Sequence, residues 1–289
     1  MGIIYDNLSA GMKPRIYSTF VEAFSDYAMD MRYMTEEIVF NRAEKNGVDF
    51  NLSVGAFDGE KLVGYTLVGI DTWKGATAAF DITTGIIKPY RGKGIARAMF
   101  DRALPGIKKR GAEIFVLEVL RENAPAVKAY TKTGFHVTRE FDCYHADIGE
   151  LSDACGSNDG IEVAPAGKDI LARFEGALDR RPSWENSFPS IRRIPDDVLI
   201  LTADAGKGPA GLLVYYPAIN WVMTIAVMKE YRRAGVGTAL LARLAGLIGH
   251  AVKRVKIMNI DRSDEGLSAF LISLGFEVLV SQYEMEMDL

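Results

Sequence analysis

The stretch YRGKGIARAMF, Tyr90–Phe100, places two glycines and two cations between an apolar segment and a segment with helical spacing. A second stretch, YRRAGVGTALL at Tyr231–Leu241, has the same design. The first arginines of the two stretches, Arg91 and Arg232, are 141 positions apart, and a Gly-Phe pair follows each of them after 43 residues. Self-similarity at a fixed distance is the mark of a duplicated unit. The sequence therefore predicts one fold used twice.

The length of the chain agrees with a duplication. A chain of 289 residues suits two domains, because a domain commonly contains about 150 residues. The repeat puts the predicted domains at residues 1–148 and 161–289. Residues 149–160, GELSDACGSNDG, are polar and small, and we expect a linker there.

Composition excludes several classes of function. The net charge is −4 and no basic stripe with interleaved aromatics occurs, so we expect no nucleic-acid partner. Cys143 and Cys155 form no CxxC motif, which predicts reduced thiols and a cytoplasmic location. The first residues, MGIIYDNLSAGMK, lack the features of a signal peptide. The three histidines have no ligand spacing, so we expect no metal.

One segment tests for a membrane span. Residues 211–228, GLLVYYPAINWVMTIAVM, run for 18 residues without a charge. Pro217 and Asn220 stand in the middle, and the flanks are rich in β-branched and aromatic residues. We expect two buried strands joined at PAIN and no membrane association.

The remaining elements can be placed coarsely. Residues 52–69 and 198–215 are predicted hairpins, one before each loop. Residues 78–88 and 113–120 are predicted strands of the first repeat. Apolar residues from position 95 to 107 recur at helical spacing, and residues 124–134 suit a short helix with Pro125 in its first turn and Gly134 at its end. The predicted fold class is α+β, a mixed and mostly antiparallel sheet flanked by helices in each domain.

The order strand, glycine loop, helix creates an anion site. The first turn of a helix has unpaired N–H groups, and glycine lets the backbone approach a phosphate closely. A Walker loop would need Ser or Thr after the Gly-Lys pair, but Gly94 stands there. A dinucleotide fingerprint would need a third glycine, but Arg97 and Leu240 occupy that position in the two copies.

These residues resemble a known family. The segments R-G-K-G-I-A at Arg91–Ala96 and R-R-A-G-V-G at Arg232–Gly237 are similar to the [Q/R]-x-x-G-x-[G/A] motif of the GNAT superfamily of acyl-CoA-dependent N-acyltransferases. LEVLRENAPAVKAYTKTGF, Leu117–Phe135, resembles the family signature found in ribosomal-protein alanine acetyltransferases. The resemblance implies acetyl-CoA as co-substrate and no metal. It also implies that loop amides hold the pyrophosphate of coenzyme A, at Arg91, Gly92, Lys93, Gly94, Ile95, Ala96, and at Arg232, Arg233, Ala234, Gly235, Val236, Gly237.

Transfer of an acyl group from a thioester to an amine requires a neutral amine, donors for the oxyanion and a proton for the leaving thiolate. Glu118 is a carboxylate inside an apolar strand, which is costly without a task, so we expect it to be the general base. Asp81 is the alternative base. Tyr130, four residues before the Gly-Phe pair, is the predicted general acid, and Asn123 is predicted to bond the pantetheine arm, cap the following helix, or both.

Two further expectations concern the cofactor and the second repeat. By family analogy, the backbone of Ile86 and Ile87 should pair with the pantetheine amides and donate to the oxyanion. In the second repeat Glu118, Asn123 and Tyr130 become Asn, Asp and Leu, so residues 161–289 are predicted to form a degenerate domain. The sequence thus predicts an acetyl-CoA-dependent N-acetyltransferase whose first domain is catalytic and whose acceptor is a small-molecule or peptide amine. The alternative is a non-catalytic acyl-CoA-binding regulatory or assembly module. The oligomeric state is not predicted.

Overall fold

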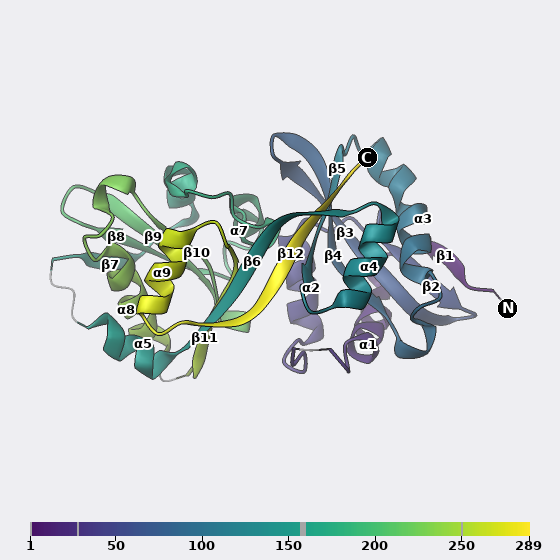
Figure 1. Cartoon of the computed structure of the whole chain (residues 1–289), viewed down its shortest axis with the longest axis horizontal. Helices are drawn as coiled ribbons and strands as arrows, with labels where there is room; N and C mark the ends of the chain where they lie inside the picture. The colour runs from purple at the N-terminus through teal and green to yellow at the C-terminus, as the bar shows by residue number, and fades with distance from the viewer. Residues whose placement is uncertain (1, 28, 157–159, 250) are drawn as a thin grey trace. The chain divides into compact units, whose positions relative to one another are not determined.

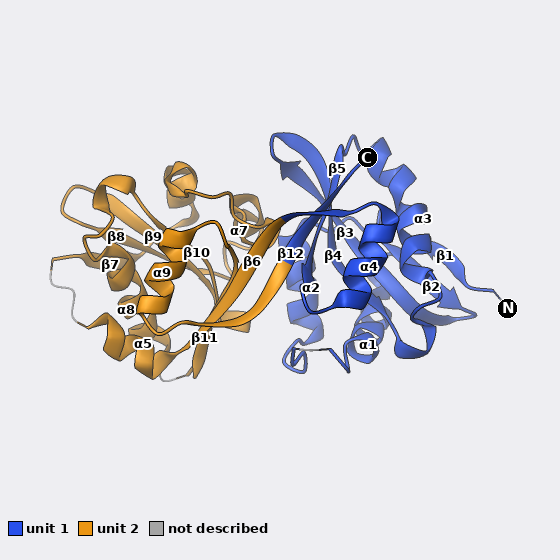
Figure 2. Cartoon of the chain, in the orientation of Figure 1, with its two compact units in different colours: residues 1–138, 283–289 blue, residues 139–282 orange. Residues whose placement is uncertain are grey.

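The computed structural model describes residues 2–27, 29–156, 160–249 and 251–289. The chain forms two compact units, each with its own hydrophobic core (Figure 2). Unit 1 contains Met1–Thr138 and Tyr283–Leu289, and unit 2 contains Arg139–Gln282.

Unit 1 is a mixed sheet with helices on both faces (Figure 1). Its sheet has the order β1-β2-β3-β4-β5-β12, in which β4 and β5 run parallel and the pairs β1–β2, β2–β3 and β3–β4 are antiparallel. The strands are β1 Ile4–Asn7, β2 Val54–Asp58, β3 Lys61–Trp73, β4 Ala76–Ile86, β5 Ile114–Leu120 and the last part of β12 Glu277–Asp288. The helices are α1 Lys13–Ala23, α2 Glu36–Lys45, α3 Ile95–Lys109 and α4 Ala124–Thr133.

Unit 2 repeats this plan. Its sheet has the order β6-β11-β10-β9-β8-β7, with β10 and β11 parallel. The strands are β6 His136–Asp147, β7 Glu162–Pro165, β8 Leu199–Asp204, β9 Pro209–Tyr216, β10 Trp221–Val227 and β11 Arg254–Asp261. The helices are α5 Ile148–Cys155, α6 Leu171–Phe174, α7 Phe188–Arg193, α8 Val236–Ile248 and α9 Glu265–Ser273.

The predicted elements and the fold class are confirmed. The hairpins are β2–β3 and β8–β9, and the uncharged segment 211–228 forms β9 and β10 joined at Pro217–Ile219. Among the described residues, no helix has both the length and the apolar character needed to cross a membrane. The turn between β3 and β4 is Lys74-Gly75, where both residues have positive φ, as a two-residue hairpin requires.

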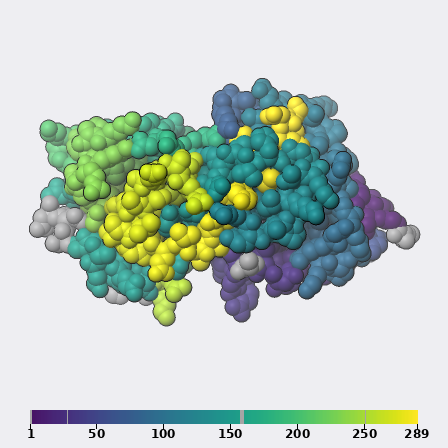
Figure 3. All heavy atoms as spheres, viewed as in Figure 1, coloured from purple at the N-terminus to yellow at the C-terminus, as the bar shows by residue number. Residues whose placement is uncertain are grey.

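Each sheet is completed by a strand from the other repeat. Residues 283–288 of β12 join the sheet of unit 1 next to β5, and Leu289 donates its N–H to the carbonyl of Glu113. Met285 and Met287 are buried in the core of unit 1 with residues of α3 and β5. Correspondingly, residues 139–147 of β6 pair with β11 in unit 2. In the space-filling view, only small yellow patches of the C-terminal segment emerge among the teal atoms of unit 1 (Figure 3).

The repeats and the compact units therefore have different boundaries. The sequence repeats are residues 1–148 and 161–289. In the structure, however, residues 139–148 fold with unit 2 and residues 283–289 fold with unit 1. The stretch 149–160, expected to be a linker, begins inside α5, whose Leu151 and Cys155 are buried in the core of unit 2. Residues 157–159 of that stretch lie outside the described residues.

Because Met285 is fully buried in unit 1, Met285→Ala should leave a cavity there and lower its stability by about 2–5 kcal/mol. Hydrogen exchange should speed up in residues 114–120 of β5, the neighbour of β12 in that sheet. Val278→Ala, on the same strand but 51% exposed, is the matched control and should change little. Faster exchange confined to unit 2 in Met285→Ala would contradict the strand exchange.

Candidate active site

The glycine loop leaves a helix N-terminus open. Helix α3 begins at Ile95, and its N-cap is Gly94 at φ 78, with no side chain to accept from the first-turn N–H groups. Gly92 also has positive φ, 75. An added Cβ at either glycine would meet no atom within 4 Å. The loop thus presents uncapped backbone donors to open space, as a diphosphate site requires.

The arginine of the motif has a structural role. Arg91 donates from Nε to the carbonyl of Ile86 (3.0 Å) and from Nη2 to the carbonyl of Ala23 (2.6 Å), and it pairs with Asp26. The guanidinium therefore joins the end of β4 to the end of α1. The hydrogen bond from Arg91 holds the pKa of the Asp26 carboxyl below its ordinary value.

Unit 2 contains the same clamp. Arg232 donates to the carbonyls of Val227 (3.2 Å) and Ala177 (2.9 Å) and pairs with Asp179. The sequence suggested Arg232 as a retained phosphate ligand, but its side chain is already committed inside the fold. Arg233, at φ 62, takes the backbone conformation of Gly92, and its side chain is exposed.

Strands β4 and β5 part in the middle of the sheet. Their parallel ladder runs from Ala78↔Ile114 to Asp81↔Leu117 and stops, although β4 continues to Ile86 and β5 to Leu120. Beyond Asp81 the two strands no longer pair. The edges that face each other there are the point at which an extended ligand can bond to backbone groups.

The two backbone residues predicted for this point differ. Ile87 donates its N–H to Val63 (3.0 Å), and its carbonyl accepts from Tyr90 (2.9 Å), so neither group remains for a ligand. Ile86 is the next residue along the ladder, and alternation turns its N–H away from β3, toward the side on which β5 has separated. The prediction for Ile87 therefore does not fit the geometry, whereas that for Ile86 does.

A β-bulge shapes β4 beside this point. Leu67 pairs with Thr83 and Val68 with Asp81, which leaves Ile82 as an extra residue. The bulge shifts the alternation of side chains, so Asp81 and Thr84 face the same side of the sheet. Thr66 of β3 pairs with Thr84 and faces that side too.

A buried polar network results. Asp81 is only 5% exposed, and its Oδ1 accepts from Thr66 Oγ1 (3.1 Å) and Thr84 Oγ1 (2.8 Å). Its Oδ2 accepts from Tyr130 Oη (3.3 Å). Burial raises the pKa of Asp81 to about 6, and these hydrogen bonds oppose the rise. Burial, together with the Asp81 carboxylate, raises the pKa of Tyr130 well above 10, so its phenol stays protonated.

Tyr130 is fixed by aromatic packing. Its ring lies 6.0 Å from that of Phe100 and 5.9 Å from that of Phe135, centroid to centroid. Asn123 caps its helix, α4, by accepting from the N–H of Ala126 (3.3 Å), which is the capping role predicted for it. These contacts hold the phenol on the face of the sheet covered by α3 and α4.

Glu118 lies on the opposite face. Phe115, Leu117 and Val119 of β5 belong to the core that packs against α3, so strand alternation directs Glu118 to the other side. This other side is the one next to α1. The ring of Tyr65, on β3, lies there against Gly85 beside the ring of Phe24, which ends α1. Glu118 is partly buried there. The predicted base and the predicted acid thus flank the parting strands from opposite faces.

Unit 2 has the same backbone with different chemistry. Its β10 carries the corresponding bulge, at Met223, and the register assigns four counterparts to the network. Thr66, Asp81, Thr84 and Tyr130 correspond to Leu213, Val222, Ile225 and Leu271. All four are apolar and at most 7% exposed. Sequence analysis found the loss of Tyr130 but missed Thr66 and Thr84, which lie on strands and belong to no motif.

Unit 2 also fills the space between its diverging strands. Asn186 donates to the carbonyl of Met258 on β11 (2.7 Å), and its own carbonyl accepts from Thr224 on β10 (3.3 Å). The buried Trp184 anchors this segment. At the glycine loop, an added Cβ on Gly237 would lie 3.0 Å from the ring of Phe270. The counterparts of Gly237 and Phe270 in the first repeat are Ala96 and Ala129, so no aromatic ring occupies this position in unit 1.

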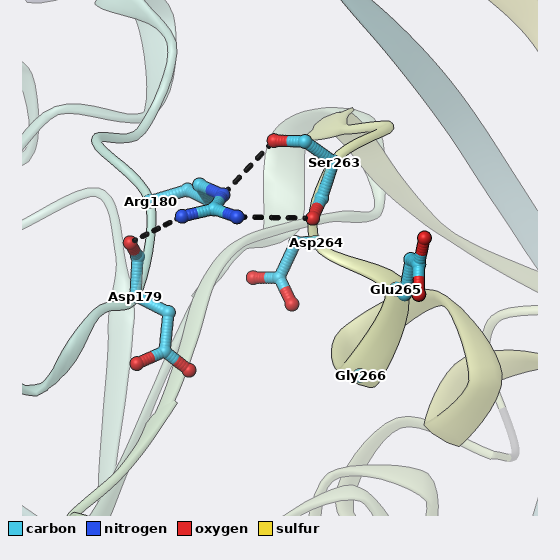
Figure 4. A pocket seen from close by; sticks show the side chains of 6 residues that line it. All are labelled: Asp179, Arg180, Ser263, Asp264, Glu265 and Gly266. Carbon is cyan, nitrogen blue, oxygen red and sulfur yellow. Dashed lines mark hydrogen bonds between the residues drawn. The ribbon is translucent and has the colours of Figure 1, made fainter.

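A cavity of about 530 Å³ lies at the start of α9 in unit 2 (Figure 4). Its lining residues are Asp179, Arg180, Ser263, Asp264, Glu265 and Gly266. Arg180 donates to the hydroxyl and carbonyl oxygens of Ser263 (2.9 and 3.3 Å). Three carboxylates against one guanidinium make this lining unsuitable for the phosphates of coenzyme A. No group of three or more potential metal ligands occurs in the part of the chain that the structure describes.

Comparison with known proteins identifies the family. Two segments, residues 14–135 and 167–276, match the Acetyltransferase (GNAT) family, and the chain belongs to that family. Streptothricin acetyltransferase of Streptomyces lavendulae is 38% identical over 84 residues, 29% of this chain and 42% of that protein. N-alpha-acetyltransferase 30 of Schizosaccharomyces pombe is 33% identical over 81 residues, 28% of this chain and 54% of that protein. The chain thus spans about half the length of these relatives.

A solved structure shows the same tandem arrangement. A tandem GNAT protein from the clavulanic acid biosynthesis pathway has a TM-score of 0.76 and 17% identity, and the match covers 99% of this chain and 98% of that one. At this identity the likeness concerns the fold alone. The tandem GNAT fold predicted from the sequence is confirmed.

The raised pKa of Asp81 predicts a pH-dependent stability. The carboxyl of Asp81 binds its proton more tightly in the folded protein than in the unfolded chain, where its pKa is near 3.8. Protonation of Asp81 therefore contributes fully to the free energy of unfolding below about pH 4, and this contribution is lost as the pH rises through about 6. A shift of this size corresponds to about 3 kcal/mol. Asp81→Asn should therefore gain stability relative to wild type between about pH 4.5 and pH 8, measured by urea unfolding. A difference between the two proteins that does not change with pH would contradict the assignment.

Proposed function

We propose that unit 1 transfers an acetyl group from the thioester of acetyl-CoA to a primary amine by direct attack. The observation that carries the proposal is the pairing of an uncapped helix N-terminus at Gly94 with strands that part between Glu118 and Tyr130. In this proposal the start of α3 holds the phosphates, and Glu118 and Tyr130 act from the two faces of the sheet where β4 and β5 no longer pair.

The residues of unit 1 suit coenzyme A. The space around Gly92 and Gly94 is open, and the amides of residues 92–96 would hold its pyrophosphate there, with Lys93 and Arg97 exposed nearby. The N–H of Ile86 would bond the thioester oxygen or a pantetheine amide where β5 has separated. Asn123 already accepts from Ala126 through its side-chain oxygen, which leaves its amide NH₂ as a donor for the pantetheine arm.

The two proton transfers are assigned to residues on opposite faces of the sheet. Glu118 takes the proton that the amine loses as its nitrogen bonds to the acyl carbon. Tyr130 gives its phenolic proton to sulfur as the carbon–sulfur bond breaks. The raised pKa of Tyr130 keeps it a proton donor at the alkaline pH at which amines are neutral. Asp81 remains the alternative base, although its carboxylate oxygens already accept from three hydroxyls.

Unit 2 has a different role in this proposal. The Asn186 bridge and the Phe270 ring packed against Gly237 argue against coenzyme A at Arg232–Gly237, where the sequence allowed it. We propose that unit 2 is structural and that the second repeat contributes to catalysis only through residues 283–289, which complete the sheet of unit 1.

The acceptor is proposed only as a class. The names of the two relatives concern streptothricin and protein N-termini, so the candidates for this chain are a small-molecule amine and a peptide amine. A cytosolic location suits the two buried free cysteines, Cys143 and Cys155.

Tyr130→Phe and Glu118→Gln should each lower kcat by roughly 100-fold, because each removes one proton transfer. The assay follows release of free thiol from acetyl-CoA across a panel of amines. Coenzyme A affinity, measured by calorimetry, should persist in both variants. Glu113→Gln, an exposed carboxylate just before β5, is the matched control and should retain full activity.

Two results would change the assignment. Undiminished turnover in both variants would remove Glu118 and Tyr130 from the mechanism. Coenzyme A binding without thiol release for any amine tested would favour the alternative function, a non-catalytic acyl-CoA-binding module.

Titration with coenzyme A should give one site per chain. Gly94→Ala forces a side chain into a positive-φ position and places a methyl group in the open space above the loop, so affinity should fall at least about tenfold. Gly235→Ala makes the same change at φ 84 in unit 2 and should leave affinity unchanged. Two sites, or equal losses in both variants, would show that unit 2 also binds.

A further inference from the structure

The network around Asp81 is costly to the fold. A carboxylate that is 5% exposed loses its hydration, and the raised pKa of Asp81 reports this penalty. Its partners Thr66, Thr84 and Tyr130 come from two strands and a helix, so three elements converge to satisfy one buried group. Such a costly network is retained either because the fold requires it or because the function of the protein requires it.

The second repeat separates these explanations. Unit 2 builds the same bulge and the same strand pairs with Leu213, Val222, Ile225 and Leu271 in the four positions. All four belong to its main hydrophobic core. The fold therefore forms without any polar group at this place, and well-packed apolar residues there avoid the desolvation cost. The network in unit 1 is thus not a requirement of the architecture.

We propose that Asp81, held by Thr66 and Thr84, is a positioning residue that fixes the hydroxyl of Tyr130 where β4 and β5 part. The inference rests on the proposed function, in which Tyr130 protonates the leaving thiolate, and it names the groups that aim this phenol. Aromatic packing against Phe100 and Phe135 fixes the ring, while the hydroxyl donates to Asp81 and also interacts with the hydroxyl of Thr84.

Asp81 acts through Tyr130 rather than on the amine. It lies on the face covered by α3 and α4, opposite Glu118, and its Oδ1 is occupied by two threonine hydroxyls. Three further titratable or charged groups lie near the pair. The charge of Tyr27 would raise the pKa of Tyr130, and the pKa of Tyr65 is raised by Asp81 and lowered by Arg42. The carboxyl and the phenol are joined directly by the hydrogen bond from Tyr130 Oη to Asp81 Oδ2 (3.3 Å).

A double-mutant cycle on the full chain tests the proposal. Asp81→Asn should lower kcat about tenfold, the scale of one misplaced hydrogen bond, and leave the KM for acetyl-CoA unchanged. In the Tyr130→Phe background, Asp81→Asn should have no further effect on kcat, because the group it positions is gone. Thr84→Val, which removes one hydroxyl and keeps the shape, should behave like Asp81→Asn and serves if that variant does not fold. Thr77→Val, at the far end of β4, is the control that should retain full activity.

The outcomes distinguish this proposal from the proposed function. If Tyr130→Phe is fully active, the assignment of the acid fails. If Tyr130→Phe is impaired but Asp81→Asn lowers kcat equally in both backgrounds, only the positioning role is overturned. A quadruple variant tests whether the network is needed for folding. It replaces the four residues by their unit 2 counterparts: Thr66→Leu, Asp81→Val, Thr84→Ile and Tyr130→Leu. We expect that protein to fold and bind coenzyme A but not to transfer, and its failure to fold would overturn the inference.

Discussion

The point at which β4 and β5 stop pairing governs the rest of unit 1. Up to Asp81 and Leu117 the ladder is closed, and the side chains on both faces serve the core. Beyond it, backbone groups of β4 lose their neighbour on one side, which is costly in an apolar interior unless a ligand replaces the strand. The bulge at Ile82, the clamp of Arg91 on Ile86 and the uncapped start of α3 all follow this point in the chain, between residues 82 and 95. These features together leave backbone hydrogen-bonding groups available at one end of the β4–β5 pair.

Unit 2 shows how the same constraint is met without a ligand. Its β10–β11 ladder also ends early, at Val222 and Ile257, but the side chain of Asn186 bonds one diverging strand and its carbonyl accepts from the other. The segment that contains Trp184 and Asn186 thus connects the two strands of unit 2 that diverge. Where the first repeat keeps polar groups and open space, the second has apolar packing and an internal bridge.

Local chemistry made much of this predictable. Glycines at fixed distances from a Gly-Phe pair identified the loop and the duplication, and the charge of Glu118 within an apolar strand marked it as exceptional. Thr66 and Thr84 could not be found, because a threonine in a strand is ordinary and only the bulge at Ile82 turns both toward Asp81. The exchange of terminal strands was equally hidden. Residues 136–147 and 277–288 follow the same helix and Gly-Phe signal, and both sheets present a parallel edge that either strand can complete. The hydrogen bond from the N–H of Ile87 to Val63 depends on which residues of β4 direct their N–H groups toward β3, and the sequence does not specify this.

The internal duplication also divides the loop motif into two parts with different tasks. Arg91 and Arg232 make equivalent bonds to the end of a strand and the end of a helix, so the arginine is explained by the architecture in both units. The glycine that begins the helix is likewise explained by its positive φ in both. Neither residue, then, is evidence that a unit binds coenzyme A. The units differ in the residues around the loop and the strands. Unit 1 has Ala129 and the polar network around Asp81, whereas unit 2 has Phe270 and apolar core residues at the corresponding positions. In a duplicated chain of this family, the motif alone therefore reports the fold, and function has to be argued from what the loop faces.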